Sequence, residues 1–308
     1  MEKILVTGGA GFIGGNLCRS LLERYEVVCM DDFSSGRREN ISDLEERDNF
    51  QLIKHNVIEP VPDLKGLNYI FHLASRASPD DYQNYPLHTL LTNSWGTLNM
   101  LELSRVNNAG FLFASTSEVY GEPLEHPQNE SYRGNVNPIG LRACYDESKR
   151  IGETLSFIYL RKYNLDVRVV RIFNTYGPGM KSDDGRVVSN FITQALKNKP
   201  LTVYGDGSQT RSFCYISDMV EGIEKAMFHE KTKGEVINLG NPEEFTVMEL
   251  AQRVQELTAS GSEIVFQNLP EDDPSRRNPD ISKAKRLLNW NPQVGLEEGL
   301  KKTIEYLR

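Results

Sequence analysis

The sequence predicts an α/β fold with a doubly wound parallel sheet and a smaller C-terminal lobe. Over the first 175 residues, short apolar runs alternate with helical periods, as in a parallel sheet that helices cover on both faces. A glycine-rich turn joins the first run to the first helical period, and a Gly/Pro/Asp-rich loop at 176–185 ends the alternation. The 308 residues, 39% of them hydrophobic, suffice for one large core or two modest ones.

Six apolar runs have the length of buried strands, and the segments between them repeat apolar residues at helical spacing. The predicted strands are 3–7, 26–30, 50–54, 68–72, 110–115 and 166–171. The predicted helices are 12–23, 87–106 and 145–163, with a further helix near 187–197.

Two lobes are expected, at 1–175 and 176–308, and no Ser/Gly linker separates them. We therefore expect their chain segments to interleave. Residues 212–241 would return to the first lobe, with a helix within 214–229 and a strand within 235–241.

Composition argues against several classes of protein. The net charge is −8 and no Lys/Arg-rich run occurs, so we expect no nucleic-acid partner. No apolar run reaches about 18 residues, so we expect no membrane span. The four cysteines are widely spaced without a C-x-x-C pair, and the five histidines lack ligand spacing. The sequence thus predicts no metal site and a reducing, cytoplasmic location.

The turn after the first strand predicts a dinucleotide site of the Rossmann type. Residues 7–14 read Thr-Gly-Gly-Ala-Gly-Phe-Ile-Gly, and the last three glycines fit G-x-G-x-x-G between a strand and a helix. Glycines let the backbone approach a diphosphate, and the free N–H groups of the helix N-terminus can bind it. The residues expected to contact the cofactor here are Gly8, Gly11, Phe12, Ile13 and Gly14.

Asp31 indicates which dinucleotide binds. It ends the second strand about 20 residues after the glycines, where a carboxylate accepts hydrogen bonds from the adenosine ribose and repels a 2′-phosphate. This favours NAD. Arg37 and Arg38 are close enough in sequence to leave NADP open.

Tyr145 and Lys149 are the candidate catalytic pair. Their spacing of four places both on one face of a helix, where an ammonium would lower the pKa of the phenol and make it a general base. The same spacing also occurs in surface pairs. Thr116, Ser117 and Glu118 follow the fifth strand, at the edge where such sheets bind ligands, and this favours catalysis.

The glycine turn, residues 115–121 (Ser-Thr-Ser-Glu-Val-Tyr-Gly) and the Tyr145/Lys149 pair together resemble the extended short-chain dehydrogenase/reductase family of nucleotide-sugar epimerases, dehydratases and decarboxylases. The resemblance covers nearly the whole chain. Within that family, the longer segments 140–150, 171–178, 184–191, 201–213 and 272–280 are similar to UDP-glucuronate decarboxylases, the UDP-xylose synthases.

The resemblance implies a three-stage reaction with bound NAD. Tyr145 would take the proton of the sugar 4-hydroxyl, with Thr116 on the same oxygen, while hydride leaves C4. The 4-ketone would favour loss of the C6 carboxylate, with Glu118 or Ser117 managing the proton at C5. Hydride would then return to C4, and Lys149 would also contact the cofactor.

The resemblance also implies that the C-terminal lobe binds the UDP-sugar. Arg142 is similar in position to an arginine that holds the sugar carboxylate, although a surface role is the alternative. The segment 201–204 would support the uracil. The other residues expected to bind substrate are Asn174, Arg186, Tyr204, Arg211 and Arg277, of which Arg186 has solvation in a loop as its alternative.

Four positions depart from the family pattern. Arg76 and Leu141 stand where proline is expected, Gly179 where arginine is expected, and Ser148 where glycine is expected. The lost and gained arginines bear on substrate choice.

Three other functions are open. A UDP-sugar 4-epimerase is the main alternative, against which Arg142 and Glu118 argue. A 4,6-dehydratase would want aspartate at Ser117. A non-catalytic NAD-binding protein would not need Tyr145, Lys149 and Thr116 intact. A homodimer formed by the helices 87–106 and 145–163 is implied by the family.

Overall fold

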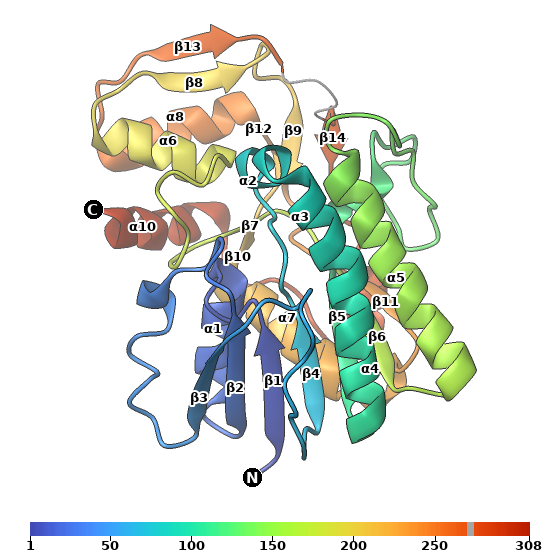
Figure 1. Ribbon diagram of the computed structural model, residues 1–308. Coiled ribbons are helices and arrows are strands. Elements are labelled where there is room, and N and C mark those ends of the chain that lie inside the picture. Colours follow the sequence, from blue (N-terminus) through green and yellow to red (C-terminus); the bar gives the residue numbers. More distant parts are fainter. Residues whose placement is uncertain (270–273) are drawn as a thin grey trace.

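A seven-stranded parallel sheet forms the centre of the computed structural model, which describes residues 1–269 and 274–308 (Figure 1). The strand order is β11-β6-β5-β4-β1-β2-β3, so the chain reverses its direction of travel across the sheet next to β1. The strands are β1 (Lys3–Thr7), β2 (Glu26–Asp31), β3 (Phe50–Lys54), β4 (Tyr69–His72), β5 (Gly110–Thr116), β6 (Val167–Ile172) and β11 (Val236–Leu239).

The sheet confirms the predicted doubly wound fold. Each of the six predicted strands agrees with an observed strand to within one residue at either end. The segment expected to return does so as α7 (Ile216–Phe228) and β11, which pairs in parallel with β6. The central strands β1 and β5 are almost entirely buried, as continuous apolar runs predict for strands covered on both faces.

Helices cover both faces of the sheet (Figure 1). On one face, α1 (Phe12–Leu21) packs against α7. On the other, α4 (Thr97–Asn107) and α5 (Ala143–Tyr163) pack against each other and on β5. An apolar core lies on each side of the sheet, and the core on the α1/α7 side continues into the smaller lobe.

The prediction of a single continuous helix over 87–106 was wrong. The segment forms α3 (Pro86–Leu91), a π-helical turn (Thr92–Gly96) and α4. Hydroxyl groups within it bond to carbonyls four residues earlier: Thr92 to His88 at 2.8 Å, Ser94 to Leu90 at 2.6 Å, and Thr97 to Asn93 at 2.6 Å. Side chains that bond to the preceding turn compete with the regular helical ladder, which accounts for the local irregularity.

Short sheets and helices make up the smaller lobe. Strand β9 (Thr210–Ser212) lies between β12 (Glu244–Thr246) and β14 (Arg276–Arg277), while β8 (Leu201–Tyr204) pairs with β13 (Ile264–Gln267). At the junction with the large sheet, β7 (Thr175–Tyr176) pairs with β10 (Cys214–Tyr215). The remaining helices are α2 (Pro79–Asn84), α6 (Val187–Leu196), α8 (Val247–Thr258), α9 (Ser282–Leu288) and α10 (Leu296–Leu307).

Within the described ranges, none of the helices has both the length and the apolar character needed to cross a membrane.

His72, the last residue of β4, is buried and forms hydrogen bonds through both ring nitrogens. Its ring nitrogens are hydrogen-bonded to the hydroxyls of Thr7, at 2.7 Å, and Thr97, at 3.1 Å. Burial, followed by repulsion from Lys149, lowers the pKa of His72 to about 3. The imidazole is therefore neutral in the folded protein at every pH near neutrality.

The free energy of unfolding should decrease at acidic pH because the unfolded chain protonates His72 more readily than the folded protein does. Because its folded pKa lies below the unfolded value of about 6.5, this contribution is complete above pH 6.5 and is lost as the pH falls towards 3. Urea unfolding at pH 7.5 and 4.5 should show a loss of about 2–3 kcal/mol that His72→Asn removes and the control His229→Gln retains. An identical pH dependence in parent and His72→Asn would contradict this assignment.

Candidate active site

One cavity of about 470 Å³ lies where the large sheet meets the smaller lobe. It is lined by residues that follow the carboxyl ends of β1, β2, β4, β5 and β6, the edge at which doubly wound sheets bind ligands. Every site residue predicted from the sequence lines this cavity. These are Gly8, Gly11, Phe12, Ile13, Gly14, Asp31, Thr116, Ser117, Glu118, Arg142, Tyr145, Lys149, Asn174, Arg186, Tyr204, Arg211 and Arg277.

The glycine turn forms a backbone cradle without room for side chains. Gly8 has a φ of +70°, and a Cβ on Gly14 would lie 2.1 Å from the carbonyl oxygen of Gly8. Gly11 caps α1 with no side-chain hydrogen bond, so the first N–H groups of the helix remain available to a ligand. This geometry fits a dinucleotide diphosphate.

Two backbone N–H groups fix the carboxylate of Asp31 at the end of β2. Its carboxylate accepts hydrogen bonds from the backbone N–H groups of Ala10, at 2.9 Å, and Phe33, at 2.8 Å. Burial raises the pKa of Asp31, and these two bonds oppose that effect. A Cβ on Gly36 would lie 2.7 Å from the carboxylate, so the adjoining loop approaches it closely.

The two arginines that could have bound the 2′-phosphate of NADP, Arg37 and Arg38, are hydrogen-bonded to other groups of the protein. Arg37 donates to the carbonyls of Gly179, at 3.0 Å, and Met180, at 3.2 Å. Arg38 donates to both oxygens of Glu45 and does not line the cavity. The cavity beside Asp31 therefore suits NAD better than NADP.

Tyr145 and Lys149 lie side by side on α5, as their spacing predicts. The ring of Tyr145 stacks on Tyr82, with centroids 5.0 Å apart, and its hydroxyl bonds to Thr116. The Lys149 ammonium donates to the carbonyl of Ala114 at 2.8 Å and lies 5.8 Å from the centre of the Tyr145 ring. Burial lowers the pKa of Lys149 to about 7.

The predicted lowering of the Tyr145 pKa was wrong for this state of the protein. Burial raises the pKa of Tyr145 to about 12, and the bond to Thr116 opposes only part of the effect. The physical reason is that desolvation of the buried phenol outweighs the nearby charges, while the Lys149 ammonium is bound to a backbone carbonyl. A positive charge brought next to the phenol would shift its pKa back down.

Glu118 joins the two lobes through a buried charge cluster. Its Oε2 atom accepts hydrogen bonds from Arg142, at 2.6 Å, and from Arg277 on β14, at 3.2 Å. Burial alone would raise the pKa of Glu118, but Arg277 and then Arg142 outweigh it and hold the pKa at about 2. At neutral pH Glu118 is thus an ionised proton acceptor, already paired with the arginine expected to bind the substrate carboxylate.

The smaller lobe supplies the opposite wall of the cavity. Arg186, at the start of α6, pairs with Asp184 at 2.7 Å, and Arg211 on β9 donates to the Thr210 carbonyl at 2.9 Å. On β8, Leu201 and Val203 are buried in the core, so only Thr202 and Tyr204 of the predicted uracil support face the cavity. Asp272 and Asp273 of the last resembling segment lie outside the described residues.

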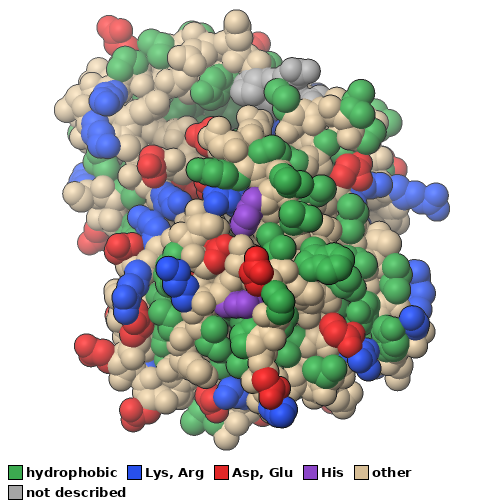
Figure 2. Space-filling view, in the orientation of Figure 1, with side chains coloured by type: hydrophobic (Ala, Val, Ile, Leu, Met, Phe, Trp, Pro, Cys, Tyr) green, Lys and Arg blue, Asp and Glu red, His purple; other side chains and the backbone are tan. Residues whose placement is uncertain are grey.

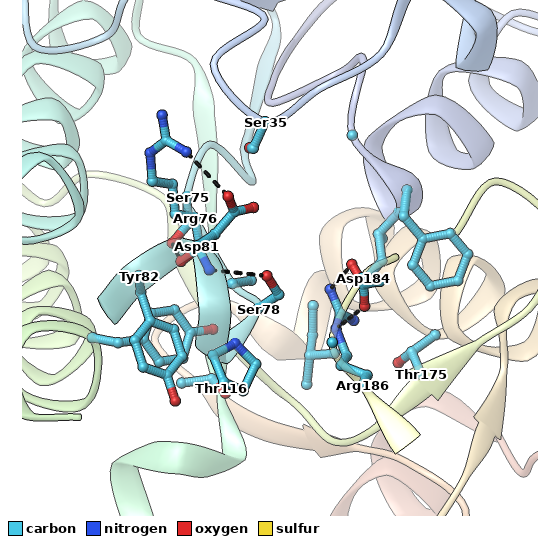
Figure 3. A pocket seen from close by; sticks show the side chains of 18 of the residues that line it. Ser35, Ser75, Arg76, Ser78, Asp81, Tyr82, Thr116, Thr175, Asp184 and Arg186 are labelled. Atoms are coloured by element: carbon cyan, nitrogen blue, oxygen red, sulfur yellow. Dashed lines mark hydrogen bonds and ion pairs between the residues drawn. The ribbon is translucent and has the colours of Figure 1, made fainter. Parts of the chain in front are cut away.

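Residues on and beside α2, which forms a further wall, were not among those predicted from the sequence (Figure 3). Tyr82 is buried against Tyr145, and within the described chain its hydroxyl has no hydrogen-bond partner. Asp81 also faces the cavity. Ser78 and Pro79 form a helix-start pattern directly after the fourth strand, a signal that could have placed these side chains at the site.

No cluster of His, Cys, Asp or Glu able to hold a metal ion occurs in the part of the chain that the structure describes.

The sequence is similar to that of proteins that use NAD and nucleotide sugars. The family model for the NAD dependent epimerase/dehydratase family matches residues 4–240. UDP-glucuronic acid decarboxylase 1 of Danio rerio is 53% identical over 306 residues, covering 99% of this chain and 72% of that protein. UDP-glucuronic acid decarboxylase 6 of Arabidopsis thaliana is 54% identical over 301 residues, covering 97% of this chain and 86% of that protein.

Solved structures share the fold over almost the whole chain. UDP-glucose 4-epimerase of Thermotoga maritima, solved with UDP-glucose, is 32% identical with a TM-score of 0.91, covering 99% of this chain and 98% of that one. UDP-glucuronic acid 4-epimerase of Bacillus cereus, solved with UDP-glucuronic acid and NAD, is 32% identical with a TM-score of 0.90 and the same coverage. The chain therefore belongs to the NAD-dependent epimerase/dehydratase family.

Proposed function

We propose that the protein is an NAD-dependent decarboxylase that converts UDP-glucuronate to UDP-xylose. The observation that carries the proposal is the position of Arg142, which donates to a carboxylate within the cavity that also holds Tyr145 and Thr116. A guanidinium in this position suits a sugar acid better than a neutral sugar. The Danio rerio and Arabidopsis thaliana relatives, at 53% and 54% identity, are UDP-glucuronic acid decarboxylases, which supports the same substrate.

The cradle and Asp31 would hold NAD, which when bound supplies a hydride acceptor and returns the hydride. Backbone N–H groups at the start of α1 would meet the diphosphate, and Asp31 would accept hydrogen bonds from the ribose hydroxyls. Lys149, fixed by the Ala114 carbonyl, completes this side of the site.

Tyr145 would act on the sugar 4-hydroxyl as general base once a positive charge bound beside the phenol lowers its pKa from about 12. It takes the proton while C4 loses hydride, and Thr116, already bonded to Tyr145, orients the same oxygen. The resulting 4-ketone lies β to the C6 carboxylate. Carbon dioxide can then leave because the electrons of the broken C5–C6 bond pass into an enolate.

Arg142 and Glu118 govern the decarboxylation step. Arg142 holds the C6 carboxylate, which shares the guanidinium with Glu118. Because Glu118 is ionised at neutral pH, it orients or accepts protons near C5 rather than donating one directly. Ser117, whose hydroxyl lies 3.4 Å from Glu118, is the neighbouring group that can relay to C5 a proton taken up from solvent, and this proton replaces the carbon lost as carbon dioxide. The C4 ketone is finally reduced, so no net redox change occurs.

The smaller lobe would hold the UDP group. Three arginines of this lobe line the cavity and could pair with a diphosphate: Arg186, Arg211 and Arg277. Asn174 would donate to the diphosphate sugar, and the half-exposed ring of Tyr204 would support the uracil.

Product analysis tests the proposed function. The full chain incubated with NAD and UDP-glucuronate should release one carbon dioxide per UDP-xylose formed, with no lasting change in NAD. Formation of the 4-epimer of UDP-glucuronate without carbon dioxide would instead identify an epimerase, and absence of turnover with intact NAD binding would indicate a non-catalytic protein.

Tyr145→Phe should lower turnover by roughly 10²- to 10⁴-fold, because the general base for the 4-hydroxyl is lost. NAD binding and the melting temperature should stay close to those of the parent. Tyr25→Phe, at a tyrosine outside the cavity, is the matched control and should retain full activity. Turnover of Tyr145→Phe at the parental rate would remove Tyr145 from the proposed role.

Arg142→Ala should weaken UDP-glucuronate binding roughly 10- to 100-fold, since a charge-assisted bond to the C6 carboxylate is lost. Binding of UDP-xylose, which lacks that carboxylate, should change far less. Titration of both ligands measures the difference, and Arg142→Lys should restore part of it. Equal losses for the two ligands would contradict the carboxylate role.

We further propose a cytoplasmic homodimer built on α3 and α5. Apolar side chains are exposed at every fourth residue along α3 and the π-helical turn. They are Leu87 (66% exposed), Leu91 (36%) and Trp95 (55%). Figure 2 shows hydrophobic side chains gathered on the part of the surface where α3 and α4 lie. Ile151 and Ile158 add exposed apolar surface on α5. A two-fold axis along these helices would bury all five side chains.

Trp95→Glu should convert the dimer to a monomer, because it places a charge in the proposed apolar contact. Sedimentation velocity at equal protein concentration measures the mass. Leu124→Glu, at a side chain that is 79% exposed in a loop, is the control and should remain dimeric. A parent that is already monomeric, or a variant of unchanged mass, would rule out this interface.

A further inference from the structure

Arg76 lies on the loop that carries the chain from β4 to α2, directly beside the glycine cradle. A Cβ on Gly8 would lie 2.8 Å from the Cα of Ala74, so this loop packs against the turn. Arg76 follows two residues later and lines the cavity, where its guanidinium pairs with the Asp81 carboxylate (Figure 3).

The guanidinium of Arg76 is buried with incomplete bonding. Its side chain is 8% exposed, and its ion pair with Asp81 is long, at 3.3 Å, and involves a carboxylate that is 30% exposed. It lies over the ring of Tyr85, 4.1 Å from the centroid. The Nε atom is buried and has no hydrogen-bond partner among the described residues. A buried cation with an unmet donor is costly unless an anion arrives to pair with it.

Among the described residues on this wall, Arg37 is the other arginine, and its guanidinium is held by backbone carbonyls. Of the described residues that line the cavity from β1 to the π-helical turn, Arg37 and Arg76 are the arginines, and no lysine lines it there. Arg37 is bound to the carbonyls of Gly179 and Met180. The glycine turn offers N–H groups and a helix dipole but no full charge.

We propose that Arg76 binds the diphosphate of the dinucleotide, exchanging its weak pairing with Asp81 for a charge-assisted bond to phosphate oxygen. The proposal rests on the use of NAD proposed above. The dinucleotide is favoured over the nucleotide sugar because the Arg76 loop packs on the cradle, whereas Arg211 and Arg277 belong to the smaller lobe and Arg277 is bound to Glu118 and the Gly121 carbonyl.

Calorimetric titration of the full chain with NAD, ADP, adenosine and UDP tests this role without measuring activity. Arg76→Leu should weaken NAD and ADP binding about 10-fold or more, and leave adenosine and UDP unchanged, because only the first two place a diphosphate at the cradle. Added salt should weaken NAD binding more steeply in the parent than in the variant. Arg38→Leu, an arginine outside the cavity, is the matched control and should bind all four ligands like the parent.

Asp81→Asn provides a second, independent measurement. Removing the competing carboxylate should tighten ADP binding several-fold, and this result stands even if Arg76→Leu fails to fold. Unchanged ADP binding in a folded Arg76→Leu or in Asp81→Asn would overturn the proposal, as would a loss confined to UDP. A parent that binds no NAD would instead refute the proposed cofactor.

Discussion

The parallel arrangement of the central strands is the constraint on which the site depends. Parallel strands end at a common edge, so the glycine turn after β1, Asp31 at the end of β2 and Thr116 at the end of β5 meet there although they are far apart in sequence. Helix α5 then places Tyr145 and Lys149 over the same edge. Neither the cradle nor the phenol would form a site alone.

Burial of ionisable groups at this edge sets the chemistry of the site. The pKa of Tyr145 is raised, the pKa of Lys149 is lowered, and the pKa of Glu118 is lowered only because two arginines surround it. Arg277 belongs to the smaller lobe, so the ion pair that keeps Glu118 charged also ties the lobes together across the cavity. Glu118 is therefore part of both the cavity lining and the contact between the lobes.

The sequence was most informative where a backbone pattern decides the outcome. Strand positions and the glycine turn followed from apolar runs and steric need, and spacing alone placed Tyr145 beside Lys149. Tertiary context decided the rest. The pKa of Tyr145 depends on burial, the π-helical turn on hydroxyl bonds, and the place of Tyr82 on the packing of α2, none of which local periodicity encodes.

Transient oxidation at C4 of UDP-glucuronate is the central claim, and an isotope at that carbon tests it most directly. The enzyme would be given UDP-glucuronate carrying deuterium at C4, with unlabelled NAD, and the UDP-xylose analysed by mass spectrometry and NMR. The account predicts a slowed reaction and product that keeps deuterium at C4, since the same hydride leaves and returns. Loss of the label, or carbon dioxide release with no isotope effect under single-turnover conditions, would contradict it.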